Sequence, residues 1–201
     1  MSRDIETSKD AAFRAVGRTV VNFQRLEHNL KLAAKLGPAQ GTMQTIQRDI
    51  EKRNERAGAL TLGRAIQAWL SYLDGGTALP AWTPDLFDIS VRVTFSLESP
   101  ADSPDSHAQA LGSLLDIRNS LIHKRLASFP WDSADACDDL VTELNSVNAC
   151  IGEQIDYVAD LLRAIEIAHK ESTEALLAAI GGESAQYAVD EASHNPPVER
   201  P

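Results

Sequence analysis

The sequence predicts an all-α helical bundle with one small β element. Apolar residues recur at three- and four-residue spacing along most of the 201 residues, the period of an amphipathic helix. Aromatic residues make up only 5% of the chain, while alanine and leucine are plentiful. One stretch, about residues 89–98, instead alternates apolar and polar side chains as a half-buried strand does. These three observations define the predicted fold class.

Three helices are predicted in the first part of the chain. The first runs from Ser8 to Leu36 and ends before a Gly-Pro pair, because proline cannot continue a helix. The second, about Thr42 to Ala57, is mostly polar and carries the densest basic cluster of the chain. The third, about Leu60 to Leu73, has one apolar face and ends at an Asp-Gly-Gly turn.

The predicted strand, Ile89–Glu98, needs a pairing partner, since an isolated strand leaves its backbone groups unpaired. No second stretch alternates as well. The segment near Leu79–Trp82 and a second copy of the chain are both candidate partners, and the sequence does not choose between them.

The second part of the chain contains two predicted helices. One carries residues 115–126 and follows a Pro-containing loop whose end caps it. The other is capped by Asp132 or Ser133 and continues to about Ile180, where two glycines end it. The predicted organisation is therefore one helical domain, residues 1–181, followed by a polar, disordered tail, residues 182–201.

The composition of the chain excludes several classes of function. A net charge of −10 argues against broad, nonspecific coating of nucleic acid but leaves room for a small basic patch. Cys137 and Cys150 lie on one predicted helix, roughly 20 Å apart, too far for a disulfide within it. Two free thiols and no signal-like N-terminus indicate the cytoplasm. No apolar run approaches the roughly 20 residues of a membrane span, and the scattered histidines predict no metal or other cofactor.

One short stretch combines residue types that suit phosphate chemistry. Asp116, Asn119 and His123 are spaced so that they share one stripe of a helix, within roughly 60° of each other. Arg118 lies further round, and its long side chain can curl toward the imidazole or meet it from a second copy of the helix. An arginine, an amide and a histidine together can hold a phosphate and move a proton.

This stretch resembles the signature of the HEPN superfamily (higher eukaryotes and prokaryotes nucleotide-binding), whose ribonuclease members carry an arginine and then a histidine after four to six residues. Asn119 matches the polar residue that commonly follows the arginine. The first helix, with Phe23-Gln24-Arg25-Leu26-Glu27-His28-Asn29-Leu30-Lys31, is similar to the opening helix of many members. The resemblance covers roughly residues 10–175 in layout and about six positions in motif.

The resemblance implies a HEPN-like antiparallel helical bundle that acts as a metal-independent endoribonuclease. Two copies would pair through their motif helices and line one composite cleft. Arg118 would clamp the scissile phosphate, His123 would handle the proton, and Asn119 would orient the imidazole or a phosphate oxygen. Lys124 and Arg125 would contact the RNA backbone. The expected products are a 2′,3′-cyclic phosphate and a 5′-hydroxyl.

The biological role implied is that of a toxin or an antiviral defence effector, with an antitoxin or a sensor as a possible partner. The members of the family that are toxins silenced by nucleotide addition carry an Arg-x4-His-x-Tyr pattern, in which the tyrosine is modified. In this sequence Arg125 occupies the position of that tyrosine. Silencing of that kind is therefore not expected.

Several residues have two interpretations. Arg53 and Arg56 form either a solvated helix face, interleaved with acidic residues, or a further RNA contact. Asp116 either supports the site or forms a salt bridge with Arg118, and Glu27 supports the site if the first helix packs against the motif helix. A second arginine–histidine pair, Arg163 and His169, is interpreted as surface residues. The alternative for the whole chain is a catalytically silent HEPN-like dimeric module that binds a nucleotide or a partner protein.

Overall fold

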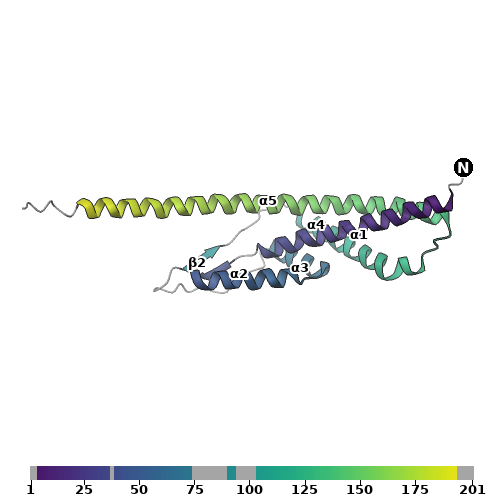
Figure 1. Ribbon diagram of the computed structural model, residues 1–201, viewed down its shortest axis with the longest axis horizontal. Coiled ribbons are helices and arrows are strands. Elements are labelled where there is room, and N and C mark those ends of the chain that lie inside the picture. Colours follow the sequence, from purple (N-terminus) through teal and green to yellow (C-terminus); the bar gives the residue numbers. More distant parts are fainter. Residues whose placement is uncertain (1–3, 37–38, 74–89, 94–102, 194–201) are drawn as a thin grey trace, which may run out of the picture. The chain divides into compact units, whose positions relative to one another are not determined.

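The computed structural model describes residues 4–36, 39–73, 90–93 and 103–193, and it confirms the all-α fold class (Figure 1). The helices are close to their predicted places. In chain order the elements are α1 (Ile5–Lys35), β1 (Ala39–Thr42), α2 (Met43–Gly58), α3 (Leu62–Leu73), β2 (Ser90–Val93), α4 (Ser103–Ser120), a π-helical turn (Leu121–Arg125), a 3-10 turn (Leu126–Ser128) and α5 (Ala134–Ser193).

The chain divides into two compact units, Met1–Ala159 and Asp160–Pro201, with the boundary inside α5. The predicted end of this helix at Gly181 is wrong, because α5 continues through both glycines to Ser193. As far as Ser193, the predicted disordered tail is therefore helical. Each glycine costs a helix only about 1 kcal/mol relative to alanine, and the alanine-rich flanks offset that cost. The next proline is Pro196, beyond the end of the helix.

The core of the first unit forms where α1 meets the first part of α5. Small residues of α1, Ala12 and Ala15, allow a close approach, and Leu140 of α5 is fully buried against them. Residues advance along both helices in the same order, so α1 and α5 run parallel here. This pair departs from the predicted antiparallel arrangement. The cluster consists of Ala12, Ala15, Leu121, Cys137, Leu140 and Leu144.

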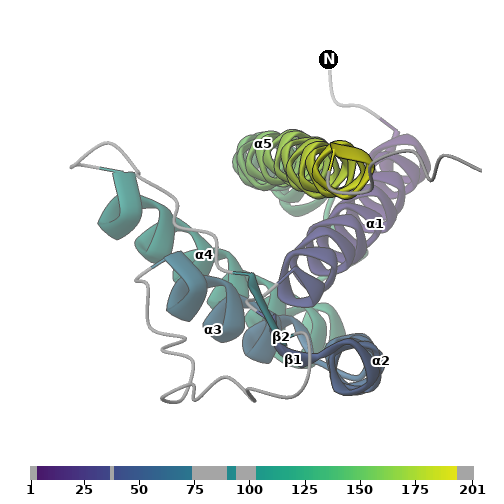
Figure 2. The ribbon, with the colours of Figure 1, turned by 90° about the vertical axis from the view of Figure 1, so that its left-hand side faces the viewer.

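Helices α3 and α4 run antiparallel where they pack against each other. Trp69 of α3 is 1% exposed and contacts His107 near the start of α4, while Gly63 at the start of α3 faces Leu115. His107 in turn lies against Tyr157 of α5. Figure 2 shows α3 beside α4 in this arrangement.

The β element is a two-stranded antiparallel ladder, in which Ala39 pairs with Val93 and Thr42 with Ser90. The predicted strand is confirmed at Ser90–Val93, and its remaining residues lie outside the described part of the chain. The segment Leu79–Trp82, one candidate partner, also lies outside it. The partner found is β1, and Thr42 at its end forms a capping box with Thr45 that begins α2.

Within the described residues, no helix has both the length and the apolar character needed to cross a membrane. Both cysteines are free, as expected; Cys137 is buried and Cys150 exposed. Burial raises the pKa of the Cys137 thiol, with a smaller contribution from the neighbouring Asp138.

We predict that Leu140→Ala lowers the free energy of unfolding by about 2–5 kcal/mol, because it leaves a cavity between α1 and α5. Leu32→Ala, at a side chain that is 36% exposed, is the control and should cost less than about 1 kcal/mol. Urea unfolding followed by circular dichroism measures both. Equal losses would mean that the core is not where the structure places it.

Candidate functional site

The candidate site lies where α4 gives way to a π-helical turn. Arg118 and Asn119 occupy the last turn of α4, and His123 is the central residue of the turn Leu121–Arg125. The turn is closed by the Leu126 amide, which donates to the Leu121 carbonyl oxygen five residues earlier. Such wide turns are rare and occur frequently at functional sites.

Leu121 fixes the orientation of this turn. Its side chain is 3% exposed and belongs to the core cluster between α1 and α5. With Leu121 directed inward, the next three residues, Ile122, His123 and Lys124, are exposed to solvent. The imidazole is therefore accessible, as a group that transfers protons with a bound substrate must be.

The two residues before the turn pair with each other. Arg118 donates from Nη1 to Oδ1 of Asn119 at 3.1 Å, and both side chains are half-buried. The expected alternative, an ion pair between Arg118 and Asp116, is replaced by this bond, and Asp116 is exposed. The bond aligns the guanidinium and leaves its other N–H groups available to donate to a phosphate oxygen.

The predicted stripe of Asp116, Asn119 and His123 assumed a continuous α-helix. The π-helical turn begins between Asn119 and His123, and its wider hydrogen-bonded ring rotates His123 relative to the residues of α4. Asn119 consequently contacts Arg118 and not the imidazole. Within this chain Asn119 orients Arg118. Its predicted role toward the imidazole or a phosphate oxygen stays a prediction.

Arg125 ends the turn and ties it to α5. Its guanidinium donates to the carboxylate of Glu143 in an ion pair. This hydrogen bond raises the pKa of Arg125, and the charge of Glu143 contributes further. A small hollow of about 90 Å³ lies beside the pair and is lined by Ile117, Ser120, Leu121, Arg125, Glu143 and Leu144. Because Glu143 neutralises part of its charge, Arg125 is a weaker candidate for an RNA contact than the exposed Lys124.

Glu27, expected to support the site, lies elsewhere. It forms an ion pair with Lys31 on the same helix at 2.7 Å. At this level α1 faces Ile155 of α5, twelve residues beyond Glu143, which is roughly 18 Å along a helix. Glu27 is therefore too far from His123 to assist it within one chain.

The basic pair of α2 also belongs to a different part of the unit. The helix packs against α1 and the two strands. Arg53 is half-buried, and burial lowers the pKa of its guanidinium. Arg56 is exposed at the last turn of the helix. The RNA contact predicted for these two arginines stays a prediction.

The burial of one histidine, His107, was not predicted from the sequence. His107 is 5% exposed, and its Nε2 accepts a hydrogen bond of 2.8 Å from Nε1 of Trp69. The ring also packs against Tyr157 in a tilted arrangement, with centroids 4.2 Å apart. The sequence does indicate this burial, because His107, Leu111 and Leu114 have the spacing of one buried helix face. The acceptor role requires Nε2 to be unprotonated, so we assign His107 a structural role in the neutral form.

No group of three or more histidine, cysteine, aspartate or glutamate side chains gathers into a possible metal site within the residues that the structure describes. Comparison of the chain with models of known protein families, with curated proteins and with solved structures finds no match. The interpretation of the site therefore depends on its own residues and geometry.

The buried His107 predicts a pH dependence of stability. Burial lowers its pKa below the ordinary 6.5, and a hydrogen bond with Gln154 opposes this only in part. The unfolded chain therefore binds a proton more readily than the folded one. As the pH falls from about 6.5 toward the lowered pKa, the free energy of unfolding should fall, and above about 6.5 this contribution is constant.

Urea unfolding of wild type and His107→Gln at about pH 7.5 and about pH 5 measures this effect. We expect the loss of stability on acidification to be smaller in the variant, because it lacks the titrating group. An identical loss in both proteins would contradict the assignment of His107 as a buried neutral imidazole.

Proposed function

We propose that the protein is a metal-independent endoribonuclease of HEPN type that cleaves RNA through attack of its own 2′-hydroxyl. The observation that supports this most is the arrangement at the end of α4. An accessible His123 lies in the π-helical turn that follows the last turn of α4, where Asn119 aligns the guanidinium of Arg118. An anchored cation and an exposed imidazole within two turns of one helix are the groups that this reaction needs.

The chemistry divides between the two side chains. In the proposed reaction His123 accepts the proton of the 2′-hydroxyl or donates one to the leaving 5′-oxygen, because histidine titrates near neutral pH. Arg118 binds the non-bridging oxygens of the scissile phosphate, whose charge grows as the phosphorane forms. The expected ends are a 2′,3′-cyclic phosphate and a 5′-hydroxyl, and neither step requires a metal ion.

A homodimer formed through the motif helix completes the proposal. Ile122 is 36% exposed beside His123, and burial of such an apolar side chain would favour association of two copies. In this arrangement Arg118 of one copy can approach His123 of the other. The exposed Lys124 would bind the RNA backbone on each side of the cleft.

A ribonuclease that cuts cellular RNA needs control. We propose that the protein acts in the cytoplasm as a toxin or an antiviral effector, held inactive by an antitoxin or activated by a sensor. Toxicity on expression, relieved by His123→Ala, would support this role.

We predict that wild type cuts a mixed RNA pool in EDTA, whereas Arg118→Ala and His123→Ala lose at least about 100-fold in rate. Arg163→Ala and His169→Ala are matched controls, since this second pair lies exposed on α5 with similar spacing. They should cut at the wild-type rate. Gel analysis gives the rates, and phosphatase treatment identifies the cyclic ends.

Two results would contradict this proposal. Equal cutting by all five proteins would indicate a contaminating nuclease. No cutting by wild type, with or without added divalent ions, would favour the alternative of a silent module that binds a nucleotide or a partner protein.

The dimer has its own test. We predict that Ile122→Asp shifts the protein from dimer to monomer in light scattering, because a charge cannot be buried at the interface without a large cost. Leu32→Asp, which changes a side chain of the same 36% exposure on α1, should leave the dimer intact. A wild type that is monomeric at high concentration would contradict the interface.

A further inference from the structure

The contact between α1 and α5 contains a polar pattern that is completed in one half only. On α1 an arginine followed four residues later by an asparagine occurs twice, as Arg18 with Asn22 and, seven residues on, as Arg25 with Asn29. Because seven residues bring a helix back to almost the same face, both pairs point toward α5.

In the first half, α5 supplies a carboxamide to each member of the pair. Arg18 donates to Oδ1 of Asn145. Asn22 donates from Nδ2 to Oδ1 of Asn148 at 2.8 Å. The Nδ2 of Asn148 then donates to the hydroxyl of Thr19 at 2.9 Å, and Thr19 is fully buried. The polar side chains in this half of the α1–α5 contact therefore form hydrogen bonds with one another.

In the second half, the equivalent residues of α5 lack an acceptor. Seven residues after Asn145 and Asn148 the chain has Gly152 and Ile155. A Cβ added to Gly152 would meet no atom within 4 Å, so the space where a carboxamide would stand is open. Ile155 offers only an apolar surface. Arg25 and Asn29 thus face α5 without the partners that Arg18 and Asn22 have.

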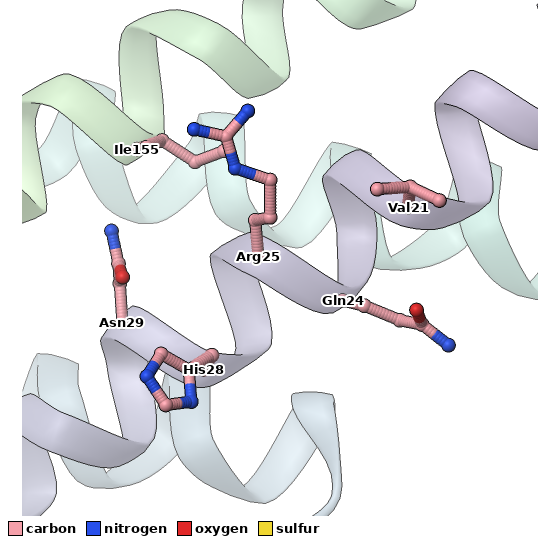
Figure 3. A pocket seen from close by; sticks show the side chains of 6 residues that line it. All are labelled: Val21, Gln24, Arg25, His28, Asn29 and Ile155. Atoms are coloured by element: carbon pink, nitrogen blue, oxygen red, sulfur yellow. The ribbon is translucent and has the colours of Figure 1, made fainter.

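A hollow of about 310 Å³ occupies this position (Figure 3). Figure 3 shows Arg25 and Asn29 extending from α1 toward α5. Val21, which is 53% exposed, and Ile155 provide apolar wall. The lining residues are Val21, Gln24, Arg25, His28, Asn29 and Ile155.

The charges around the hollow favour an anion. Among the described residues, no carboxylate forms an ion pair with Arg25. Glu27, the nearest acidic residue on α1, is already engaged by Lys31 at 2.7 Å. The hollow therefore combines a cation with the side-chain donors of His28 and of two amides, and none of its lining residues is acidic.

From the unpaired second half of the α1–α5 contact we infer a second binding site, in which a phosphate group of a nucleotide takes the place of the missing carboxamides. The planar guanidinium of Arg25 binds two phosphate oxygens, and Asn29 donates its amide N–H to another. The apolar wall suits the nonpolar face of a sugar or base. The volume is at the lower end for small-molecule sites, which fits a mononucleotide or one terminal nucleotide of an RNA strand.

The test measures binding by isothermal titration calorimetry with adenosine 5′-monophosphate, inorganic phosphate and a short single-stranded RNA with or without a 5′-phosphate. The protein carries His123→Ala, so that proposed RNA cleavage does not interfere. We expect adenosine monophosphate to bind, and Arg25→Gln to weaken it at least tenfold. Arg14→Gln, at an exposed arginine of α1 outside the hollow, should bind as the parent does.

Gly152 provides a second pair of variants. Gly152→Asn supplies a carboxamide where Asn145 stands in the first half, so it should compete with the ligand and weaken binding at least tenfold. Gly152→Ala adds only a methyl group in open space and should preserve binding, with helix stability retained or improved. Thermal unfolding confirms that both variants fold.

The outcomes separate the ligand sources. Binding of the mononucleotide indicates a free ligand, whereas binding only of 5′-phosphorylated RNA indicates a strand end. Either supports the site if Arg25→Gln and Gly152→Asn each weaken it at least tenfold. No binding of any probe, or equal binding by parent and Arg25→Gln, would overturn the inference. Neither result depends on whether the protein cleaves RNA.

Discussion

The contact between α1 and the first part of α5 determines where the candidate functional groups lie. Two alanines of α1 allow the helices to approach closely, and Leu121 fills the space between them. Since Leu121 is the first residue of the π-helical turn, its burial directs the following residues outward. The accessibility of His123 is thus a consequence of core packing. The ion pair between Arg125 and Glu143 holds the other end of the turn against α5.

Much of the fold could be predicted from the sequence, because apolar residues recur clearly at the spacing of an amphipathic helix. The face formed by Leu111 and Leu114 is buried as expected, and α1, α2 and α3 begin and end within a few residues of their predicted bounds. The strand at Ser90–Val93 was recognisable from its alternation, but its partner was not. β1 is four residues long and includes a glycine, so its sequence carries almost no strand signal.

The residues of the candidate site could be chosen from the sequence, but their geometry could not. The order Arg118, Asn119, His123 identified the segment, whereas the π-helical turn depends on how Leu121 packs against residues distant in sequence. The contact between α1 and α5 likewise depends on residues that are distant in sequence. The repeated arginine–asparagine pairs of α1 are visible in the sequence, but their unequal partners, Asn148 and Ile155, become informative only once the two helices are seen in register.

The most direct test of the central claim uses the substrate and leaves the protein unchanged. If His123 and Arg118 promote attack by the 2′-hydroxyl, an RNA with a single 2′-deoxy substitution at the cleaved nucleotide should resist the wild-type protein at that position alone. Cutting elsewhere on the same strand serves as the internal control. Continued cutting at the deoxy position would show that water or another nucleophile attacks the phosphate, and the proposed mechanism would then be wrong.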